Sequence, residues 1–346
     1  MSADSTHAGA EAPATRSGTR RTIAAAIGAM RQEVILLGVL IAMVVFFASI
    51  NPRFLSAAAA ANILQDFGPV MLMAIGQTYV IVTGGIDLSV GSVLGLSGVT
   101  TAIVAKAGNV SGLSPAATIG LALLCGVATG FIVGLINGLL VTRVRLAPFI
   151  ATLATMGAAF GTTLVVTNGV QIAGGPREVV TIGNTTYLGV FTGPILLVFL
   201  ITAVAWVFLS KARVGRYTYA IGSNSFAARA AGINVRRHLV KMYVLSGMLA
   251  ALAGVLVYFR LASGAPSSGQ GGELQAIAAA VIGGVSLSGG VGRLSGTILG
   301  AFIITSVLSG LILIGVAPAW QQIVIGALIA IAVGVQGIGS TRKGEM

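Results

Sequence analysis

The sequence predicts an all-α polytopic membrane protein with about ten transmembrane helices and with both termini in the cytoplasm. Hydrophobic residues make up 56% of the 346 residues and charged residues only 8%, whereas soluble domains carry about 25% charged residues. Apolar runs also recur along the chain at about the 20-residue length that a helix needs to cross a bilayer. The expected spans are 34–50, 67–83, 89–105, 116–141, 147–167, 194–210, 242–262, 273–292, 294–314 and 319–337.

The distribution of basic residues predicts the orientation of these spans. With the N-terminus inside, the chain places 16 of its Lys and Arg residues in the cytoplasm, out of 20 in total. The remaining four lie outside or at the outer edge: Arg53, Lys106, Arg177 and Arg260. Such an excess of inner positive charge is the usual bias of membrane proteins. It also explains the net charge of +12, so membrane lipid is the expected partner and nucleic acid is not.

The composition divides the chain into three regions. Residues 1–33 are polar and rich in Ala, Ser and Thr, so we expect a disordered cytoplasmic tail. This tail is not a cleavable signal peptide, because no apolar core begins before about Val34. Residues 34–337 form a single transmembrane domain, and residues 338–346 form a cytoplasmic C-terminal tail.

The cytoplasmic loop at about 211–241 is long, basic and without any acidic residue. Its segment Asn224–Ile233 is predicted to form a short helix, since alanines favour the helix body and Gly232 can end it. The start of this helix can be capped by Ser223, Asn224 or Ser225. Phe226 and Ile233 would share one small apolar face that suits the groove of a partner protein. Stabilisation of its own loop, or attraction to anionic lipid, is the equal alternative from the residues alone.

A glycine-rich stretch, Gly84–Ser92, interrupts the apolar pattern between the second and third spans. Irregular backbone of this kind survives in a membrane only inside protein or beside a water-filled cavity. We assign a helix break and cap to four of its residues: Gly84, Gly85, Asp87 and Ser89. For the carboxylate, capping of the third span through the helix dipole is favoured over substrate contact. The pattern of Gly84–Gly95 returns at Gly289–Gly300, which indicates one structural device used twice.

Few polar residues stand within the predicted spans, and transporter sites use a small number of well-placed polar groups near the midplane. We therefore predict that Gln77, Thr78 and Asn137 line a translocation path, with Phe149 as an apolar gate. Interhelical hydrogen bonds are the alternative role for the polar members of this set.

The sequence contains no phosphate-binding loop of the G-x-x-x-x-G-K-[ST] type, no metal-ligand cluster and no nucleophile–base constellation. We expect neither enzymatic activity nor a bound metal or cofactor. Near the spans, only Asp87 and Glu273 stand out as acidic candidates, whereas ion-coupled carriers normally use chains of intramembrane carboxylates or histidines. Uphill transport would therefore depend on a partner that supplies the energy, with an ion gradient as the less favoured source.

Five stretches of the chain resemble one family of transport proteins. Ile81–Ser92, which reads IVTGGIDLSVGS, closely resembles the signature of the inner-membrane permeases of ribose-type ABC sugar importers. Four further stretches are similar to the same family and follow in the expected order: Gly138–Val141 with Leu146–Leu153, Tyr219–Asn224 with Ala228–Ile233, Ala276–Gly290, and Gly296–Ala301. The resemblance covers roughly residues 35–337. Gln275 departs from it, because an acidic residue is expected there.

The resemblance implies a multi-pass permease subunit in a bacterial cytoplasmic (inner) membrane. Such a subunit would form a homodimer or pair with a paralogous permease. It would dock a cytoplasmic ABC ATPase, which would hold ATP and Mg²⁺, and would receive a sugar from an extracytoplasmic binding protein. The resemblance also implies that the cytoplasmic loop couples to the ATPase through Gly222, Asn224, Ala228, Arg229, Ala231, Gly232 and Ile233.

The resemblance further implies a pentose-like sugar or a close analogue as the cargo. Alternatives are an ABC permease for another small polar solute, such as a branched-chain amino acid, a nucleoside or a polyol. An ion-coupled secondary sugar carrier and a non-transporting membrane scaffold are the alternatives of other classes.

Overall fold

A computed structural model describes the backbone of residues 16–344 and the side chains of residues 32–334. Within this part of the chain the fold is helical, with only four two-residue strands. The helices that dominate it are α1 (Arg16–Ile50), α2 (Ala57–Val82), α3 (Val90–Val110), α4 (Pro115–Leu139), α5 (Pro148–Thr167), α7 (Gly193–Ser210), α10 (Val235–Leu261), α11 (Gly272–Ile282), α12 (Leu294–Leu313) and α13 (Pro318–Gly344).

The predicted all-α membrane fold is confirmed. Eight of the described helices are long and apolar enough to cross a membrane, namely α1 to α5, α7, α10 and α12. The other two predicted spans correspond to shorter apolar helices, α11 and the apolar part of α13. The span expected at 273–292 ends as a helix at Ile282. Gly284, Gly289 and Gly290 beyond it have positive φ angles that a regular helix does not allow.

The expected terminal tails differ from the structure where it describes them. Helix α1 begins at Arg16, inside the region 1–33 expected to be disordered, and continues into the first span. Alanines in this stretch favour the extension of the helix. Helix α13 likewise runs through most of the expected tail 338–346. Residues 1–15 and 345–346 lie outside the described residues.

Helix α10 lies at the centre of the bundle, where it packs against α2, α3 and α4. Glycines allow the helices to approach closely. A Cβ added at Gly130 or Gly134 of α4 would overlap backbone atoms of α10, and one at Gly247 of α10 would overlap α4. Small residues at such positions let membrane helices pack backbone to backbone. The main apolar core therefore forms around α2, α3 and α10.

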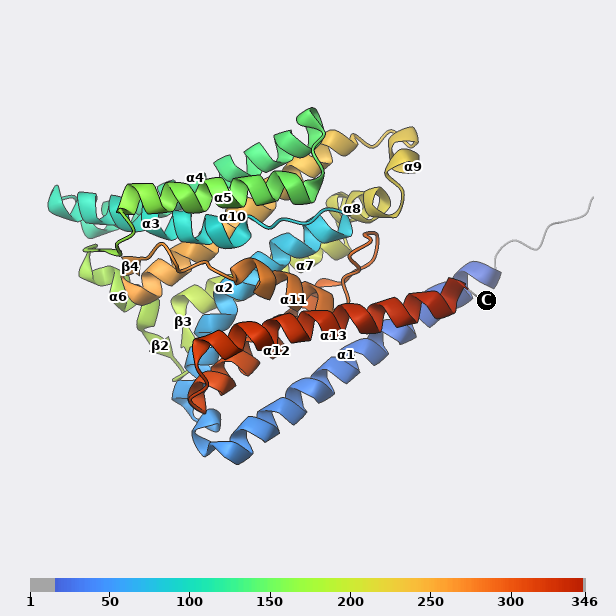
Figure 1. Cartoon of the computed structure of the whole chain (residues 1–346), viewed down its shortest axis with the longest axis horizontal. Helices are drawn as coiled ribbons and strands as arrows, with labels where there is room; N and C mark the ends of the chain where they lie inside the picture. The colour runs from blue at the N-terminus through green and yellow to red at the C-terminus, as the bar shows by residue number, and fades with distance from the viewer. Residues whose placement is uncertain (1–15, 345–346) are drawn as a thin grey trace, which may run out of the picture.

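The two ends of the bundle are different (Figure 1). At one end lie the short helices α8 (Arg213–Ser223) and α9 (Ser225–Ala230). The beginning of α1 and the end of α13 lie at the same end, consistent with termini on one side of the membrane. At the other end lie α6 (Arg177–Asn184) and two antiparallel strand pairs, β1 (Ile172–Ala173) with β4 (Ser263–Gly264) and β2 (Thr186–Tyr187) with β3 (Phe191–Thr192). We refer to these as the α9 end and the α6 end.

Candidate functional site

Helix α9 forms in the loop at 211–241, where the sequence predicted a short helix. Asn224 caps it, because its side-chain oxygen accepts the N–H groups of Phe226 and Ala227 at 3.0 and 2.9 Å. Gly232 follows the helix with a φ of +82°, as expected for a residue that ends it. The cap and the terminating glycine are therefore confirmed.

The predicted shared face of Phe226 and Ile233 is wrong. Helix α9 ends at Ala230, so Ile233 lies beyond it after the chain has turned at Gly232. Ile233 packs against the small cluster of Ile221, Ala228 and Val235. Phe226 is 79% exposed and does not belong to this cluster. The described residues thus leave Phe226 uncovered, together with the exposed residues Arg229 and Ala231.

Four glycines from three distant segments meet at the end of α8, which directly precedes α9. Gly290 donates its N–H to the carbonyl oxygen of Val82 at 2.8 Å. A Cβ on Gly222 would overlap that same carbonyl and the nitrogen of Gly290. A Cβ on Gly289 would lie 3.0 Å from the Cα of Gly84. We call Gly84, Gly222, Gly289 and Gly290 the glycine junction.

Tyr219 of α8 adds a side-chain link to this junction. Its hydroxyl donates to the carbonyl oxygen of Gly292 at 2.8 Å. Burial raises the pKa of the Tyr219 hydroxyl, although nearby Arg293 acts in the opposite direction. The hydroxyl therefore keeps its proton and remains a donor at neutral pH. The loop at 211–241 is thus bonded to the segment between α11 and α12, and it packs against the end of α2.

The two copies of the repeated glycine pattern are therefore in contact with each other. Gly84 and Gly85 separate α2 from α3, and Gly289 and Gly290 separate α11 from α12. Both glycine pairs precede a helix long enough to span a membrane, α3 in one case and α12 in the other. Their meeting at Gly222 could not be read from the sequence, since the three segments are far apart along the chain.

Asp87 is fully buried at the centre of a polar network deeper in the bundle. Its carboxylate accepts hydrogen bonds from the N–H and hydroxyl of Ser89, at 3.0 and 2.6 Å, and from the hydroxyl of Ser246 at 2.8 Å. Asn137 donates to the Ser89 hydroxyl at 2.8 Å and accepts from Thr155 at 2.6 Å. The network therefore ties the start of α3 to α4, α5 and α10.

This arrangement differs from the capping role expected for Asp87 and Ser89. Ser89 is the N-cap residue of α3, but its side chain makes no capping hydrogen bond. Its hydroxyl is directed to Asp87, and Asp87 accepts the N–H of Ser89 rather than one from the first turn of α3. Buried carboxylates persist where several donors satisfy them, so the network compensates this charge.

The residues predicted to line the translocation path are spread over the bundle. Gln77 is buried, and neither of its amide atoms has a hydrogen-bond partner among the described residues. Thr78 bonds to the Ala74 carbonyl and lies 2.9 Å from the hydroxyl of Thr297. Phe149 is 51% exposed at the start of α5. None of these, nor Asn137, lines either of the two described cavities, so their role in a path stays a prediction.

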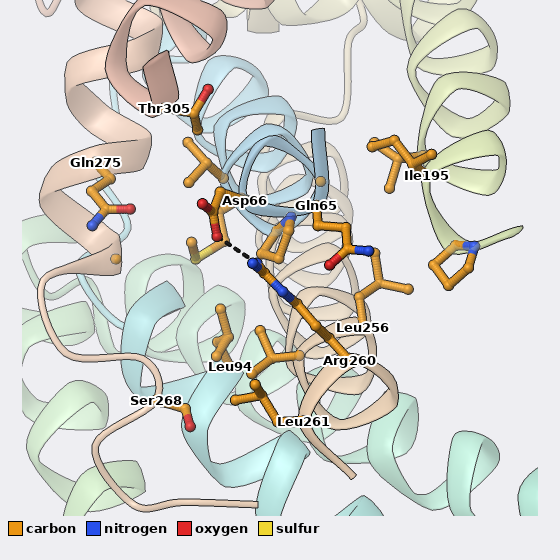
Figure 2. Close-up of a pocket in the computed structure, with 18 of the residues that line it drawn as sticks. Gln65, Asp66, Leu94, Ile195, Leu256, Arg260, Leu261, Ser268, Gln275 and Thr305 are labelled. Atoms are coloured by element: carbon orange, nitrogen blue, oxygen red, sulfur yellow. Dashed lines mark hydrogen bonds and ion pairs between the residues drawn. The ribbon is translucent and has the colours of Figure 1, made fainter. Parts of the chain in front are cut away.

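The larger of these cavities has a volume of about 310 Å³ and involves the halves of α2 and α10 nearer the α6 end. Figure 2 shows Gln275 of α11 and Ile195 of α7 on opposite sides of it. One part of the lining is apolar and includes Leu94, Leu256 and Leu261. The other part is polar: Gln65, Asp66, Arg260, Ser268, Gln270, Gln275, Thr305 and Gln321. We call this space the outer cavity.

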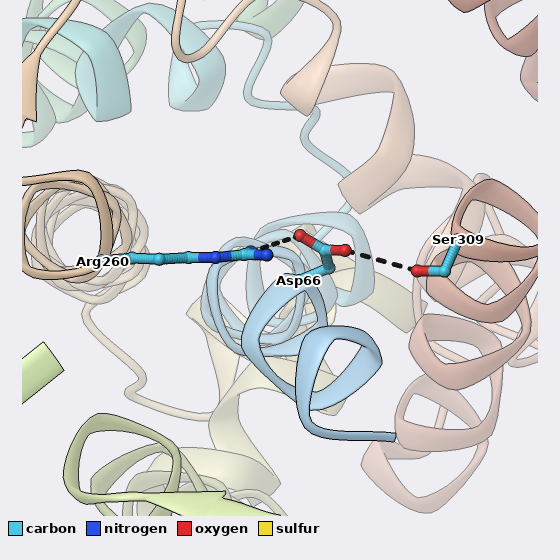
Figure 3. A network of polar contacts seen from close by, with 3 residues as sticks. All are labelled: Asp66, Arg260 and Ser309. Carbon is cyan, nitrogen blue, oxygen red and sulfur yellow. Dashed lines mark hydrogen bonds and ion pairs between the residues drawn. The ribbon is translucent and has the colours of Figure 1, made fainter. Parts of the chain in front are cut away.

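An ion pair crosses the outer cavity. Asp66 of α2 binds Arg260 of α10, and its second oxygen accepts from the hydroxyl of Ser309 of α12 at 3.3 Å. Figure 3 shows the carboxylate between these two partners. Sequence reasoning missed this pair, because it began the second span at residue 67 and left Asp66 outside. The alanine-rich run that precedes Asp66 was the available signal, since it allows α2 to begin at Ala57.

The chain is similar to known permeases over most of its length. A family model described as "Branched-chain amino acid transport system / permease component" matches residues 59–333. The ribose import permease of Bacillus subtilis is 44% identical over 293 residues, covering 84% of this chain and 88% of that protein. The ribose import permease of Escherichia coli is 40% identical, covering 88% and 92%.

Another relative is named as an import permease for a different sugar. The fructose import permease of Rhizobium meliloti is 36% identical over 307 residues, covering 87% of this chain and 83% of that protein. No solved structure matches the chain significantly. The family match includes α3 to α12, both helix breaks and the loop at 211–241. The chain therefore belongs to the family of branched-chain amino acid transport system permease components, and it is a multi-pass membrane transport subunit rather than an enzyme.

Proposed function

We propose that this chain is the membrane-spanning permease subunit of an ATP-driven ABC importer that translocates a pentose-like sugar or a close analogue. The sugar would be delivered by an extracytoplasmic binding protein. The names of the relatives support this cargo, because import permeases for ribose, fructose and galactose all match most of the chain. Residues 34–337 would act as one permease domain, with 211–241 as its coupling loop.

The structural observation that carries this proposal is the glycine junction. It joins the end of α8, next to the cap of α9, to both helix breaks through backbone contacts, and a side chain at Gly222 has no space. Closely packed interiors have low compressibility and transmit displacement. A movement of α9 driven by an ATPase would therefore shift the ends of α2 and α11 together. Rigid-body rocking of this kind is a common route to alternating access.

The proposed partners fit the two ends of the bundle. The exposed side chains of Phe226 and Arg229 would contact a cytoplasmic ABC ATPase, which would bind ATP and Mg²⁺. The α6 end would face the sugar-binding protein. Two permease subunits, either identical or paralogous, would form the complex. Lipid of a bacterial inner membrane would cover outward apolar faces such as that of α7, with Leu200 and Phe208 exposed.

The description of the matching family supports a second candidate cargo, a branched-chain amino acid. Uptake into proteoliposomes that contain the permease, its ATPase and its binding protein separates the candidates. We expect ATP-dependent accumulation of D-ribose or a related sugar and no accumulation of L-leucine. Leucine uptake would move the assignment to the second candidate. Accumulation that ignores ATP depletion and collapses with an ionophore would exclude an ABC importer altogether.

A further inference from the structure

The outer cavity has the chemistry of a site for a neutral, polyhydroxylated ligand. Asp66 and Arg260 are the only charged side chains in its described lining, and their charges cancel. The polar part also holds amide and hydroxyl groups, including Gln65, Gln275 and Thr305, which donate as well as accept hydrogen bonds. The apolar part, including Leu256, can contact the C–H groups of a sugar ring. A lining that combines apolar side chains with a few polar groups is typical of small-molecule sites.

The ion pair has unused hydrogen-bonding capacity. A carboxylate can accept about four hydrogen bonds and a guanidinium carries five N–H donors. In the described contacts, each oxygen of Asp66 accepts one hydrogen bond, and Arg260 uses one of its N–H donors. The side chain of Asp66 is 40% exposed and that of Arg260 is 29% exposed. Ion pairs with such access to solvent stabilise a fold little, so this one can open at low cost.

We propose that Asp66 and Arg260 form a sugar-recognition subsite in the outer cavity, where ring hydroxyls replace part of their mutual contact. Asp66 accepts hydrogen bonds from two neighbouring hydroxyls of the sugar, and Arg260 donates a hydrogen bond to a hydroxyl or ring oxygen. Ser309 holds the second oxygen of Asp66 in place. This inference rests on the proposed function and names the residues that would first receive the sugar on the permease.

The geometry favours an uncharged sugar over a charged ligand. A phosphorylated sugar would bring a net negative charge into a lining whose two charges already cancel. A zwitterionic amino acid could use both charges, but it would leave several of the surrounding amide and hydroxyl groups without partners. Polar groups left unpaired on binding reduce affinity. A sugar with four or so hydroxyls satisfies more of them.

The test compares Asp66→Asn and Arg260→Gln with the unmodified protein in the complete transporter, using D-ribose and its monodeoxy analogues as probes. Each substitution should raise the KM for ribose uptake by about tenfold or more with little change in Vmax, because a charge-assisted hydrogen bond is lost. For one deoxy analogue, the ratio of its KM to the KM for ribose should fall towards unity in Asp66→Asn. All variants are assayed with the same binding protein, so its own preference among the sugars cancels when the variants are compared.

Lys106→Gln is the matched control, because it also removes an exposed positive charge near the α6 end and does not line the cavity. It should leave the KM unchanged. Arg260→Lys retains the charge and should recover part of the affinity, which also guards against a variant that fails to fold. Unchanged deoxy discrimination in a transporting Asp66→Asn protein would overturn the subsite. Absence of any sugar uptake by the unmodified complex, or uptake of leucine alone, would instead overturn the proposed function.

Discussion

The glycine junction and the outer cavity show two opposite ways in which α2 contacts other parts of the chain. At the junction, α2 meets its partners through backbone atoms, and a side chain at Gly222 has no space. In the cavity, α2 meets α10 through the long, half-exposed side chains of Asp66 and Arg260. The backbone contact at the junction is suited to transmitting movement while its partners stay the same. The ion pair in the cavity is suited to replacing one hydrogen-bond partner by another, such as a sugar hydroxyl.

The comparison implies that substitutions at the two ends will fail in different ways. Changes at the junction should separate ATP hydrolysis from transport and leave the apparent affinity for sugar alone. Changes in the cavity should alter the apparent affinity and leave the amount of sugar moved per ATP alone. The following predictions test this division, from the largest expected effect to the smallest.

Gly222→Ala should have the largest effect. Its new methyl group would overlap the Val82 carbonyl, and overpacking of a tight site costs about 1–3 kcal/mol. We expect the sugar moved per ATP to fall about tenfold or more, measured with parallel uptake and phosphate-release assays. Gly120→Ala is the control, since a Cβ at Gly120 meets nothing within 4 Å. Equal coupling in both variants would contradict a force-transmitting junction.

Asp87→Asn tests the polar network that lies between the two regions. It replaces one acceptor oxygen by an amide donor, although three hydrogen bonds converge on the carboxylate. Loss of satisfied buried hydrogen bonds costs about 1–3 kcal/mol, so the free energy of unfolding should fall by that amount. Thermal unfolding of the purified protein in detergent measures it. A stability equal to that of the exposed-site variant Thr162→Ala would show that the network contributes nothing.

Tyr219→Phe should weaken the junction more mildly than Gly222→Ala. It removes the hydroxyl that donates to Gly292 and keeps the ring. A hydrogen bond of this kind contributes about 0.5–1.5 kcal/mol, so coupling should fall by roughly two- to tenfold. Tyr217→Phe, at an exposed position of the same helix, is the matched control and should couple normally. If the KM for sugar uptake changed and coupling did not, Tyr219 would act on sugar binding. This result would contradict its role in the junction.

Ser309→Ala should have the smallest effect. The hydroxyl contacts Asp66 at 3.3 Å, which is a long hydrogen bond. We expect the KM for sugar uptake to rise by no more than about threefold, because such a bond contributes little. Coupling should stay unchanged. Titration of uptake against sugar concentration measures this, and a larger rise than that of Asp66→Asn would place recognition on Ser309.

The sequence was sufficient for features that depend on local chemistry. The apolar runs, a cap at one of three neighbouring residues and the two glycine breaks follow from residues close together in the chain. The structure contains them, with Asn224 as the cap, although the run at 273–292 is helical only to Ile282. The helix at α9 was also expected, but its length was not. A terminating glycine was placed correctly at Gly232, whereas the helical face was extended through it to Ile233, which the turn makes impossible.

Features that depend on distant segments could not be predicted. Nothing near Gly222 shows that it will face Val82 and Gly290. The expected second span began at residue 67, which left Asp66 outside it, and the partner of Asp66, Arg260, comes from another helix. Gln77 and Thr78 stood out as polar residues in an apolar run, but their neighbours depend on how that run packs. Packing alone decides which polar residue reaches a cavity.

The central claim is that α9 and the two helix breaks move as one body. Spin labels at Arg229 and Val291, both exposed, test it directly by double electron–electron resonance in complexes with one labelled copy. We predict the same Arg229–Val291 distance distribution with and without bound ATP. A second pair, Val291 with Lys106 near the α6 end, should change between the two states. A nucleotide-dependent change in the first pair with a constant second pair would contradict the claim.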